Sequence, residues 1–380
     1  MKILYIITQG EMGGAQVYVK SLAEASKGRN WAFNLALGES NDNWLSQGFG
    51  SLGGRIYPIK HLRREISPLN DFLVILELFK LLHKINPDVI HLNSSKAGVV
   101  GSLASLAYRI SGKKTKVIYT AHGWVFNEPM IFFKKLIFLW LEKITSPIKD
   151  KIICVSEFDR AVGIKSSIKT ADNLVTIHNG IKLPNEYFLS RSEAREKIGP
   201  FPETALVIGT IANFYKTKGL EFLIRAFDLL VKDNKEKYLK LAIIGDGEMR
   251  QQLEKLIASC GLNDKVVLLG RIDQASKYLR AFDIFVMSSV KEGFPYSLLE
   301  AQLAGVPVVA TKVGGIPEII NDSVNGLLAR PKDPIDLTAK MQILIDNASI
   351  RDRFVQSGIK KVTNDFSLEE MLQRTLSLYK

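Results

Sequence analysis

The chain has 380 residues, of which 46% are hydrophobic and 24% are charged. This composition excludes long disordered tails, and the length exceeds what one hydrophobic core usually serves, so two α/β domains are expected. The formal net charge is +12, with the excess of Lys and Arg concentrated in residues 1–185. Such an excess indicates an anionic partner, either nucleic acid or acidic lipid headgroups, or else an ordinary solvated basic surface.

Short β-branched runs alternate with amphipathic stretches along the whole chain. In the first half the expected strands are KILYIIT, AFNLAL, RIYPI, DVIHL, KVIYT and KIICV, with helices over 15–27, 69–85 and 96–110. After the polar stretch 182–202 come ALVIGTI, KLAIIG, KVVLLG, DIFVMS and VPVVAT, with helices from Gly219, from Glu248 and near Tyr296. The alternation predicts two doubly wound parallel sheets with helices on both faces, joined near residues 183–203.

Cysteine usage and the start of the chain bear on its location. Cys154 and Cys260 belong to no CxxC pair or metal cluster and are expected to be buried reduced thiols. The chain opens directly on a strand, without the pattern of a signal peptide, so a cytoplasmic location is expected.

The longest apolar segment is MIFFKKLIFLWL, over 130–141. It is shorter than the roughly twenty residues that a bilayer-spanning helix needs. As a helix it is either buried in the core or lies in a membrane interface with Lys134 and Lys135 at the headgroups, and both interpretations stay open.

A glycine-containing loop, QGEMGGA, follows the first expected strand. Gly13 and Gly14 would let backbone amides approach a phosphate at the N-terminus of the next helix. The spacing is not GxGxxG, so a dinucleotide site is not supported, and an ordinary strand-to-helix turn is an equal alternative.

The most specific segment is SSVKEGFPYSLLEAQLA, over 288–304. It combines a strand end, a Gly-Phe-Pro turn, a helix N-terminus and two carboxylates, Glu292 and Glu300. In open parallel sheets, ligands bind outside the carboxyl ends of the strands, so this corner is expected to bind one.

This segment resembles the glutamate pair of the retaining glycosyltransferases of family 4. Ordered matches extend over nearly the whole chain: GG at 13–14, YTAHGW at 119–124, VSE at 155–157, HNGI at 178–181, KG at 218–219, IGDGE at 244–248, LGR at 269–271 and VGGIPE at 313–318. The resemblance implies the α/β GT-B fold, in which two Rossmann-like doubly wound parallel-sheet domains face a cleft. Residues 1–185 would bind the acceptor, residues 190–362 would bind the nucleotide sugar, and a helix over 367–380 would cross back to the N-terminal domain.

The resemblance also implies the activity, which is retaining transfer of a hexose-type sugar from a UDP- or GDP-sugar. We expect the acceptor to be a polyprenyl-linked glycan of surface polysaccharide assembly, at the inner face of the cytoplasmic membrane, with an anionic membrane surface as a further partner. No cofactor or metal is expected, since the sequence has neither a DxD motif nor a zinc pattern among its histidines. Nucleic acid is not an expected partner, because no basic run is interleaved with aromatic residues.

Three residues match catalytic positions of the family. Glu292 is expected to orient the donor or to stabilise the oxocarbenium-like transition state, and Lys218 to stabilise the leaving diphosphate. His122 matches the N-domain histidine near the donor sugar and the acceptor. The alternatives are an ordinary solvated lysine and a structural histidine.

The implied donor site also contains Glu300, whose carboxylate would accept hydrogen bonds from the ribose hydroxyls. Asn213 stands where the family usually has an arginine, so one charge-assisted phosphate contact is lost, and Lys216 is the expected substitute. The donor site comprises Gly13, Gly14, Asn213, Lys218, Arg271, Gly293, Phe294, Pro295 and Glu300. The expected acceptor-binding residues are His91, Asn93, Ser94 and His122.

Two other functions compete with this interpretation. A sugar-nucleotide epimerase would have the same fold and the same cleft, although the ordered family 4 motifs argue against it. A catalytically silent nucleotide-sugar-binding module is motivated by Asn213 in place of arginine.

Overall fold

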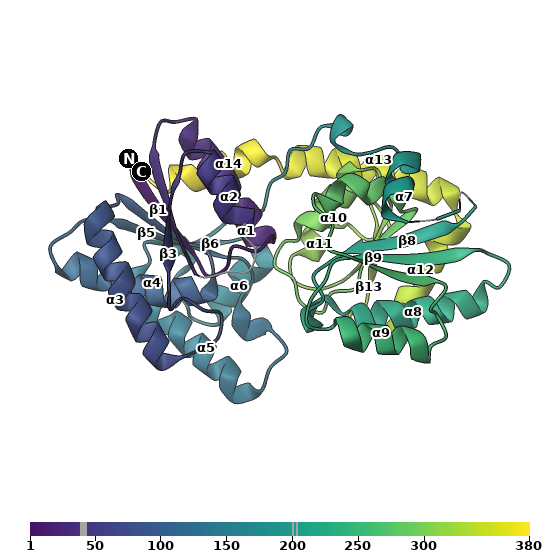
Figure 1. Ribbon diagram of the computed structural model, residues 1–380, viewed down its shortest axis with the longest axis horizontal. Helices are drawn as coiled ribbons and strands as arrows, with labels where there is room; N and C mark the ends of the chain where they lie inside the picture. Colours follow the sequence, from purple (N-terminus) through teal and green to yellow (C-terminus); the bar gives the residue numbers. More distant parts are fainter. Residues whose placement is uncertain (39–43, 200, 203) are drawn as a thin grey trace. The chain divides into compact units, whose positions relative to one another are not determined.

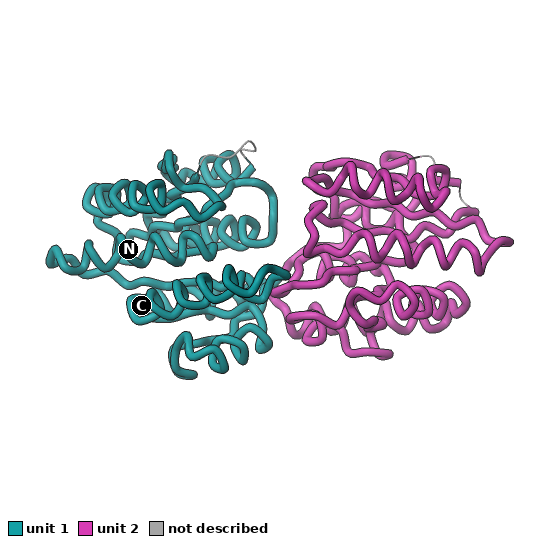
Figure 2. Tube along the Cα trace, turned by 90° about the horizontal axis from the view of Figure 1, so that it is seen from below, with its two compact units in different colours: residues 1–180, 368–380 teal, residues 181–367 magenta. Residues whose placement is uncertain are grey.

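The computed structural model describes residues 1–38, 44–199, 201–202 and 204–380, and these form two compact units (Figure 2). Unit 1 comprises Met1–Gly180 and Leu368–Lys380, and unit 2 comprises Ile181–Ser367. The last segment of the chain therefore packs in the same unit as the first strand.

The described residues of unit 1 form a parallel sheet of seven strands in the order β3-β2-β1-β4-β5-β6-β7. Its strands are β1 (Lys2–Ile7), β2 (Ala32–Gly38), β3 (Arg55–Ile59), β4 (Val89–Leu92), β5 (Lys116–Ala121), β6 (Lys151–Cys154) and β7 (Leu174–Thr176). Its helices are α1 (Gly14–Lys27), α2 (Trp44–Ser51), α3 (Pro68–Ile85), α4 (Ser95–Ile110), α5 (Phe132–Thr145), α6 (Glu157–Lys165) and α14 (Leu368–Ser377). The strand order reverses direction between β1 and β4, and in doubly wound sheets ligands bind at this point.

Strand β1 explains why helices cover both faces of this sheet. Leu4 and Ile6 pack in the core cluster that also holds α3 and α4, whereas Ile3, Tyr5 and Ile7 pack in the cluster with α1, α2 and α14. Figure 1 shows the same division, with α3, α4 and α5 on one side of the strands. An unbroken apolar run is what a strand buried on both faces requires.

Unit 2 repeats this plan. Its described residues form a six-stranded parallel sheet in the order β10-β9-β8-β11-β12-β13. The strands are β8 (Leu206–Ile211), β9 (Leu239–Ile244), β10 (Val266–Gly270), β11 (Ile284–Met287), β12 (Val308–Thr311) and β13 (Leu327–Ala329). The helices are α7 (Arg191–Ile198), α8 (Leu220–Asp233), α9 (Arg250–Ser259), α10 (Tyr296–Leu303), α11 (Ile316–Ile319), α12 (Pro334–Asp346) and α13 (Ala348–Asp365).

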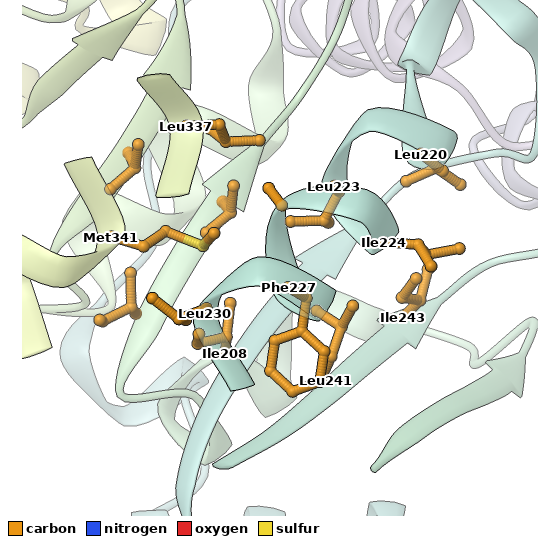
Figure 3. Close-up of a cluster of buried hydrophobic side chains, with 14 of the residues drawn as sticks. Ile208, Leu220, Leu223, Ile224, Phe227, Leu230, Leu241, Ile243, Leu337 and Met341 are labelled. Carbon is orange, nitrogen blue, oxygen red and sulfur yellow. The ribbon is translucent and has the colours of Figure 1, made fainter. Parts of the chain in front are cut away.

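The core of unit 2 is shown in Figure 3. Leu223, Phe227 and Leu230 of α8 are buried against strand residues such as Leu241 and against Met341 of α12. These packed side chains hold α8 against the sheet and against α12. The prediction of two doubly wound parallel sheets is confirmed.

None of the helices in the described part of the chain combines the length and the apolar character needed to cross a bilayer.

Candidate functional site

The carboxyl edge of the unit 2 sheet brings Lys218 and Glu292 together. Lys218 ends a 3-10 turn (Lys216–Lys218) after β8, and Glu292 lies in the loop between β11 and α10. Lys218 Nζ donates a hydrogen bond to Glu292 Oε1 at 2.6 Å, and the two side chains are 27% and 9% exposed. The residues meet because β8 and β11 are neighbours in the sheet.

Two serines that the sequence analysis did not single out hold this pair. Ser289 Oγ donates to the same Glu292 Oε1 at 2.6 Å, and Ser288 Oγ donates to the carbonyl oxygen of Lys218 at 3.0 Å. The backbone N–H of Val290 donates to Thr217 O at 2.8 Å. The loop and the turn are thus tied by side chains and backbone. The sequence feature that could have indicated the contact between Ser289 and Glu292 is a serine three residues before a glutamate in a loop.

A tight glycine turn supports the Glu292 loop from the other side. Gly315 N–H donates to Gly293 O at 2.9 Å. Gly314 has φ +54°, and a Cβ there would lie 1.8 Å from Glu292 O. Phe294 is buried with its ring centroid 5.1 Å from that of Phe366, and Pro295 immediately precedes α10. These residues fix the backbone that carries the carboxylate.

Replacing Gly314 with alanine should therefore destabilise unit 2, because the new Cβ clashes with backbone and also forces a residue with a side chain into the left-handed region. We expect a loss of roughly 2–4 kcal/mol, the range of a strained, clashing substitution. Differential scanning calorimetry can measure it. Gly261→Ala is the matched control, since Gly261 has φ +68° with nothing within 4 Å of its Cβ position. Equal effects of the two substitutions would contradict the clash.

Glu300 lies on α10, one turn from its start, and is partly buried. Burial raises the pKa of its carboxyl to about 7, and a hydrogen bond with Ser276 acts in the opposite direction. Ser276 Oγ is also 2.9 Å from Tyr187 Oη. Sequence reasoning identified neither Ser276 nor Tyr187, because they lie in loop and turn segments far from Glu300 in the chain.

The other expected donor residues of unit 2 follow β8 and β10, which β9 separates in the sheet. Asn213 follows β8, and its carbonyl oxygen accepts a hydrogen bond from Tyr215 N–H at 2.8 Å. Arg271 follows β10 and is exposed. Burial acts to raise the pKa of Asp246, but hydrogen bonds from Gly247 N–H and Arg250, and the charges of Arg250 and Arg271, lower it. Lys216, the expected substitute for the missing arginine, is exposed.

Gly13 and Gly14 lie at the N-terminus of α1 in unit 1. Gly13 is the extended residue that precedes the helix, with φ −171°, and Gly14 is its first residue. Gln16 Nε2 donates to Gln9 O at 2.8 Å, which folds the loop back over the helix start.

His91, one of the expected acceptor-binding residues, lies in the core of unit 1. Its side chain is fully buried, with Nδ1 2.6 Å from Tyr379 Oη and Nε2 2.7 Å from Thr120 Oγ1. Burial, and then the charge of His122, lowers its pKa to about 3, so the imidazole is neutral. To contact a sugar acceptor directly, a ring nitrogen of His91 would have to give up its hydrogen bond with Tyr379 or Thr120.

Asn93, Ser94 and His122 lie where the neighbouring strands β4 and β5 end. Asn93 Nδ2 donates to His91 O at 2.9 Å, whereas Asn93 Oδ1 and His122 Nε2 are buried without a partner among the described residues. Burial lowers the pKa of His122 to about 3. Ser94 Oγ accepts from Ala97 N–H at 3.2 Å and caps α4. Buried polar atoms normally have partners, so the two unpaired ones indicate a place for a ligand or water.

Within the described ranges, no three His, Cys, Asp or Glu side chains gather as a metal site would. Cys154 is a buried free thiol, as expected, whereas Cys260 is free but only partly buried.

Comparisons with known proteins agree with this architecture. The model of Glycosyltransferase Family 4 matches residues 12–183, and that of Glycosyl transferases group 1 matches residues 191–361. A UDP-Gal:alpha-D-GlcNAc-diphosphoundecaprenol alpha-1,3-galactosyltransferase of Escherichia coli is 26% identical over 86% of this chain and 83% of its own. The capsular polysaccharide biosynthesis glycosyltransferase CapM of Staphylococcus aureus is 27% identical over 84% of this chain and 83% of its own.

Among solved structures, Anabaena HepE in complex with UDP and glucose has a TM-score of 0.84 at 22% identity, covering 99% of this chain and 98% of that one. Sucrose-phosphate synthase of Thermosynechococcus elongatus has a TM-score of 0.82 at 21% identity, covering 100% and 98%. At these identities the likeness shows the fold. Because the two family models together match most of the chain in the expected order, the chain belongs to the glycosyltransferases of family 4 and has their GT-B fold.

Proposed function

We propose that the chain is a retaining, metal-independent hexosyltransferase that uses a nucleoside diphosphate sugar. The observation that carries the proposal is the bond from Lys218 Nζ to Glu292 Oε1 at the carboxyl edge of the unit 2 sheet. It sets a cation beside a carboxylate, immediately before the helix that carries Glu300. Sugar transfer uses both charges, since negative charge grows on the departing diphosphate and positive charge grows at the anomeric carbon.

In the proposed reaction the bond from the anomeric carbon to the diphosphate oxygen breaks, and a bond to an acceptor hydroxyl oxygen forms on the same face. The hydroxyl proton passes to the departing phosphate. The incoming diphosphate competes with Glu292 for the Lys218 ammonium. Ser289 remains hydrogen-bonded to Glu292 and holds the carboxylate while its cation is shared.

For the donor, we propose that Glu300 accepts hydrogen bonds from the ribose, with Ser276 and Tyr187 orienting its carboxylate. Asn213 and Arg271 remain proposed contacts of the phosphates and base, together with the Gly13-Gly14 loop of unit 1. The Escherichia coli relative is named for UDP-Gal, and HepE was crystallised with UDP-glucose, which favours a UDP-sugar over a GDP-sugar.

For the acceptor, we propose a polyprenyl-diphosphate-linked glycan used at the cytoplasmic face of a membrane. The name of the Escherichia coli relative contains such an acceptor, and CapM is named for capsular polysaccharide. In unit 1, the unpaired Asn93 Oδ1 can accept a hydrogen bond from a hydroxyl group of this glycan. The unpaired His122 Nε2 supplies a ring nitrogen for a second such contact.

A panel of nucleotide sugars tests the proposal, first by thermal shift and then by transfer to an undecaprenyl-diphosphate-linked acceptor followed by mass spectrometry. We expect one UDP-sugar to stabilise the protein and to extend the acceptor by one hexose. A donor that binds but is never hydrolysed or transferred would support the silent binding module instead. Conversion of the bound donor into an epimer would support the epimerase.

Replacing Ser289 with alanine should lower kcat about 10- to 100-fold, because a hydrogen bond to a charged group contributes roughly 1.5–3 kcal/mol. The donor KM should change little, since Lys218 remains in place. Steady-state kinetics on the intact chain measure both. The matched control is Ser259→Ala, whose hydroxyl donates to Leu256 O at the end of α9. Ser289→Thr keeps a hydroxyl and should restore part of the rate, and an unchanged kcat in Ser289→Ala would rule out the positioning role.

A further inference from the structure

Helix α5 exposes an apolar surface that the fold of unit 1 does not cover. Phe132, Phe133, Ile137 and Trp140 are 67%, 76%, 50% and 61% exposed. Ile131, Leu136 and Ile144 are exposed as well, whereas Phe138 and Leu139 pack against the core. Single exposed apolar side chains are ordinary, but a dense row of them marks an interaction surface. The interpretation of 130–141 as a buried core helix is therefore wrong.

The exposed charged side chains of α5 are all positive. Lys134, Lys135 and Lys143 of α5 are exposed. Glu142, the sole acidic residue of α5, is buried and accepts a hydrogen bond from the equally buried Lys149 at 2.8 Å. The exposed part of the helix thus combines large apolar side chains with flanking cations, which is typical of helices that lie in the headgroup region of an anionic bilayer.

Helix α3 adds a second apolar row to the same layer. Leu69, Phe72 and Leu76 follow helical spacing and are 72%, 58% and 41% exposed. Helices α3, α4 and α5 cover one face of the sheet, with α4 in contact with both of the others (Figure 1). Because each follows a parallel strand, their N-termini share the carboxyl edge, where Asn93 and His122 lie.

We propose that the surface formed by α5 and the exposed row of α3 docks unit 1 onto an anionic lipid bilayer. Phe132, Phe133 and Trp140 enter the boundary between headgroups and acyl chains, and the three lysines contact lipid phosphates. A second copy of the chain is a poorer occupant, because a symmetric contact would set the lysines of the two copies against each other. Docking brings the carboxyl edge of unit 1 close to the bilayer, within reach of a lipid-linked substrate.

Co-sedimentation of the intact chain with vesicles tests the docking surface. We expect binding to an equimolar mixture of phosphatidylglycerol and phosphatidylcholine, weaker binding to phosphatidylcholine alone, and weakening by salt. The double variant Phe133→Ser, Trp140→Ser should lower the partition coefficient by at least about tenfold, since each ring loses its burial in lipid. The variant Lys134→Gln, Lys135→Gln should lose most of the preference for anionic vesicles.

The control is Ile335→Ser, which removes a side chain that is 72% exposed at the start of α12 in unit 2. Melting temperatures should be unchanged in all variants, because the altered side chains are exposed. Equal partition of the wild type and the Phe133, Trp140 variant would overturn the proposal, as would dimerisation through this face without vesicle binding. Nucleotide-sugar binding by the variants should be unaffected, so failure of docking and failure of the proposed transferase function give different results.

Discussion

Replacing Lys218 with alanine should lower kcat of sugar transfer by about two to three orders of magnitude, the usual effect of removing one preorganised group that stabilises transition-state charge. The substitution removes the ammonium aimed at the departing diphosphate. It also leaves the Glu292 carboxylate, which is only 9% exposed, without its cation. Donor binding should weaken too, because the ground-state diphosphate is already charged.

Glu292→Gln separates these two effects. The amide keeps the size of the side chain and can still accept from Ser289, but it carries no charge to stabilise the anomeric centre. We expect a similar loss in kcat with donor affinity retained or improved, because Lys218 is freed for the diphosphate. Steady-state and single-turnover kinetics measure both quantities. Lys232→Ala, which alters an exposed lysine of α8, is the control. A Glu292→Gln enzyme with full kcat would contradict the assigned role.

Unit 1 should lose about 2 kcal/mol of unfolding free energy between neutral pH and pH 5 because of His91 alone. Burial, and then the charge of His122, lowers the pKa of His91 from 6.5 to about 3. Below pH 6.5 the unfolded chain binds a proton that the folded unit does not, so stability falls as the pH falls, down to the folded pKa. His122, whose pKa burial also lowers to about 3, adds to the same slope.

Urea unfolding followed by tryptophan fluorescence measures this loss in unit 1, because Trp31, Trp44, Trp124 and Trp140 all lie there. His91→Gln stays neutral at every pH and should remove the contribution of His91 to the slope between pH 5 and 7, leaving that of His122, whatever the baseline stability of the variant. An unchanged slope would mean that His91 is not the buried neutral group described here.

Sequence reasoning located the regular elements well where hydrophobic periodicity dominates. The helices expected over 15–27, 69–85 and 96–110 are Gly14–Lys27, Pro68–Ile85 and Ser95–Ile110. The bounds of these helices could be predicted closely, because each is a long amphipathic segment between two buried strands and must cover the sheet with one face.

The chemistry of the site depended on contacts that no local pattern encodes. Lys218 and Glu292 are 74 residues apart and meet because β8 and β11 are adjacent in the sheet, so only the family resemblance singled them out together. Sequence reasoning placed His91 among the expected acceptor-binding residues, but it could not predict the contact of its buried ring with Tyr379, 288 residues away.

The exposure of α5 could not be predicted either. Its sequence is apolar over much of the helix circumference, and periodicity alone does not distinguish a face buried in protein from a face offered to lipid. The tertiary structure makes the distinction, because Phe138 and Leu139 pack against the core of unit 1 while Phe132, Phe133 and Trp140 are exposed.

Calorimetric titration of the wild type and Lys218→Ala with UDP, GDP and the corresponding nucleosides shows whether Lys218 in unit 2 binds the diphosphate of a sugar nucleotide. We expect the diphosphate that binds the wild type to bind the variant at least about tenfold more weakly, because a charge-assisted contact is lost. The affinity for the matching nucleoside should stay the same. Equal affinity of both proteins for the diphosphate would mean that Lys218 does not bind it.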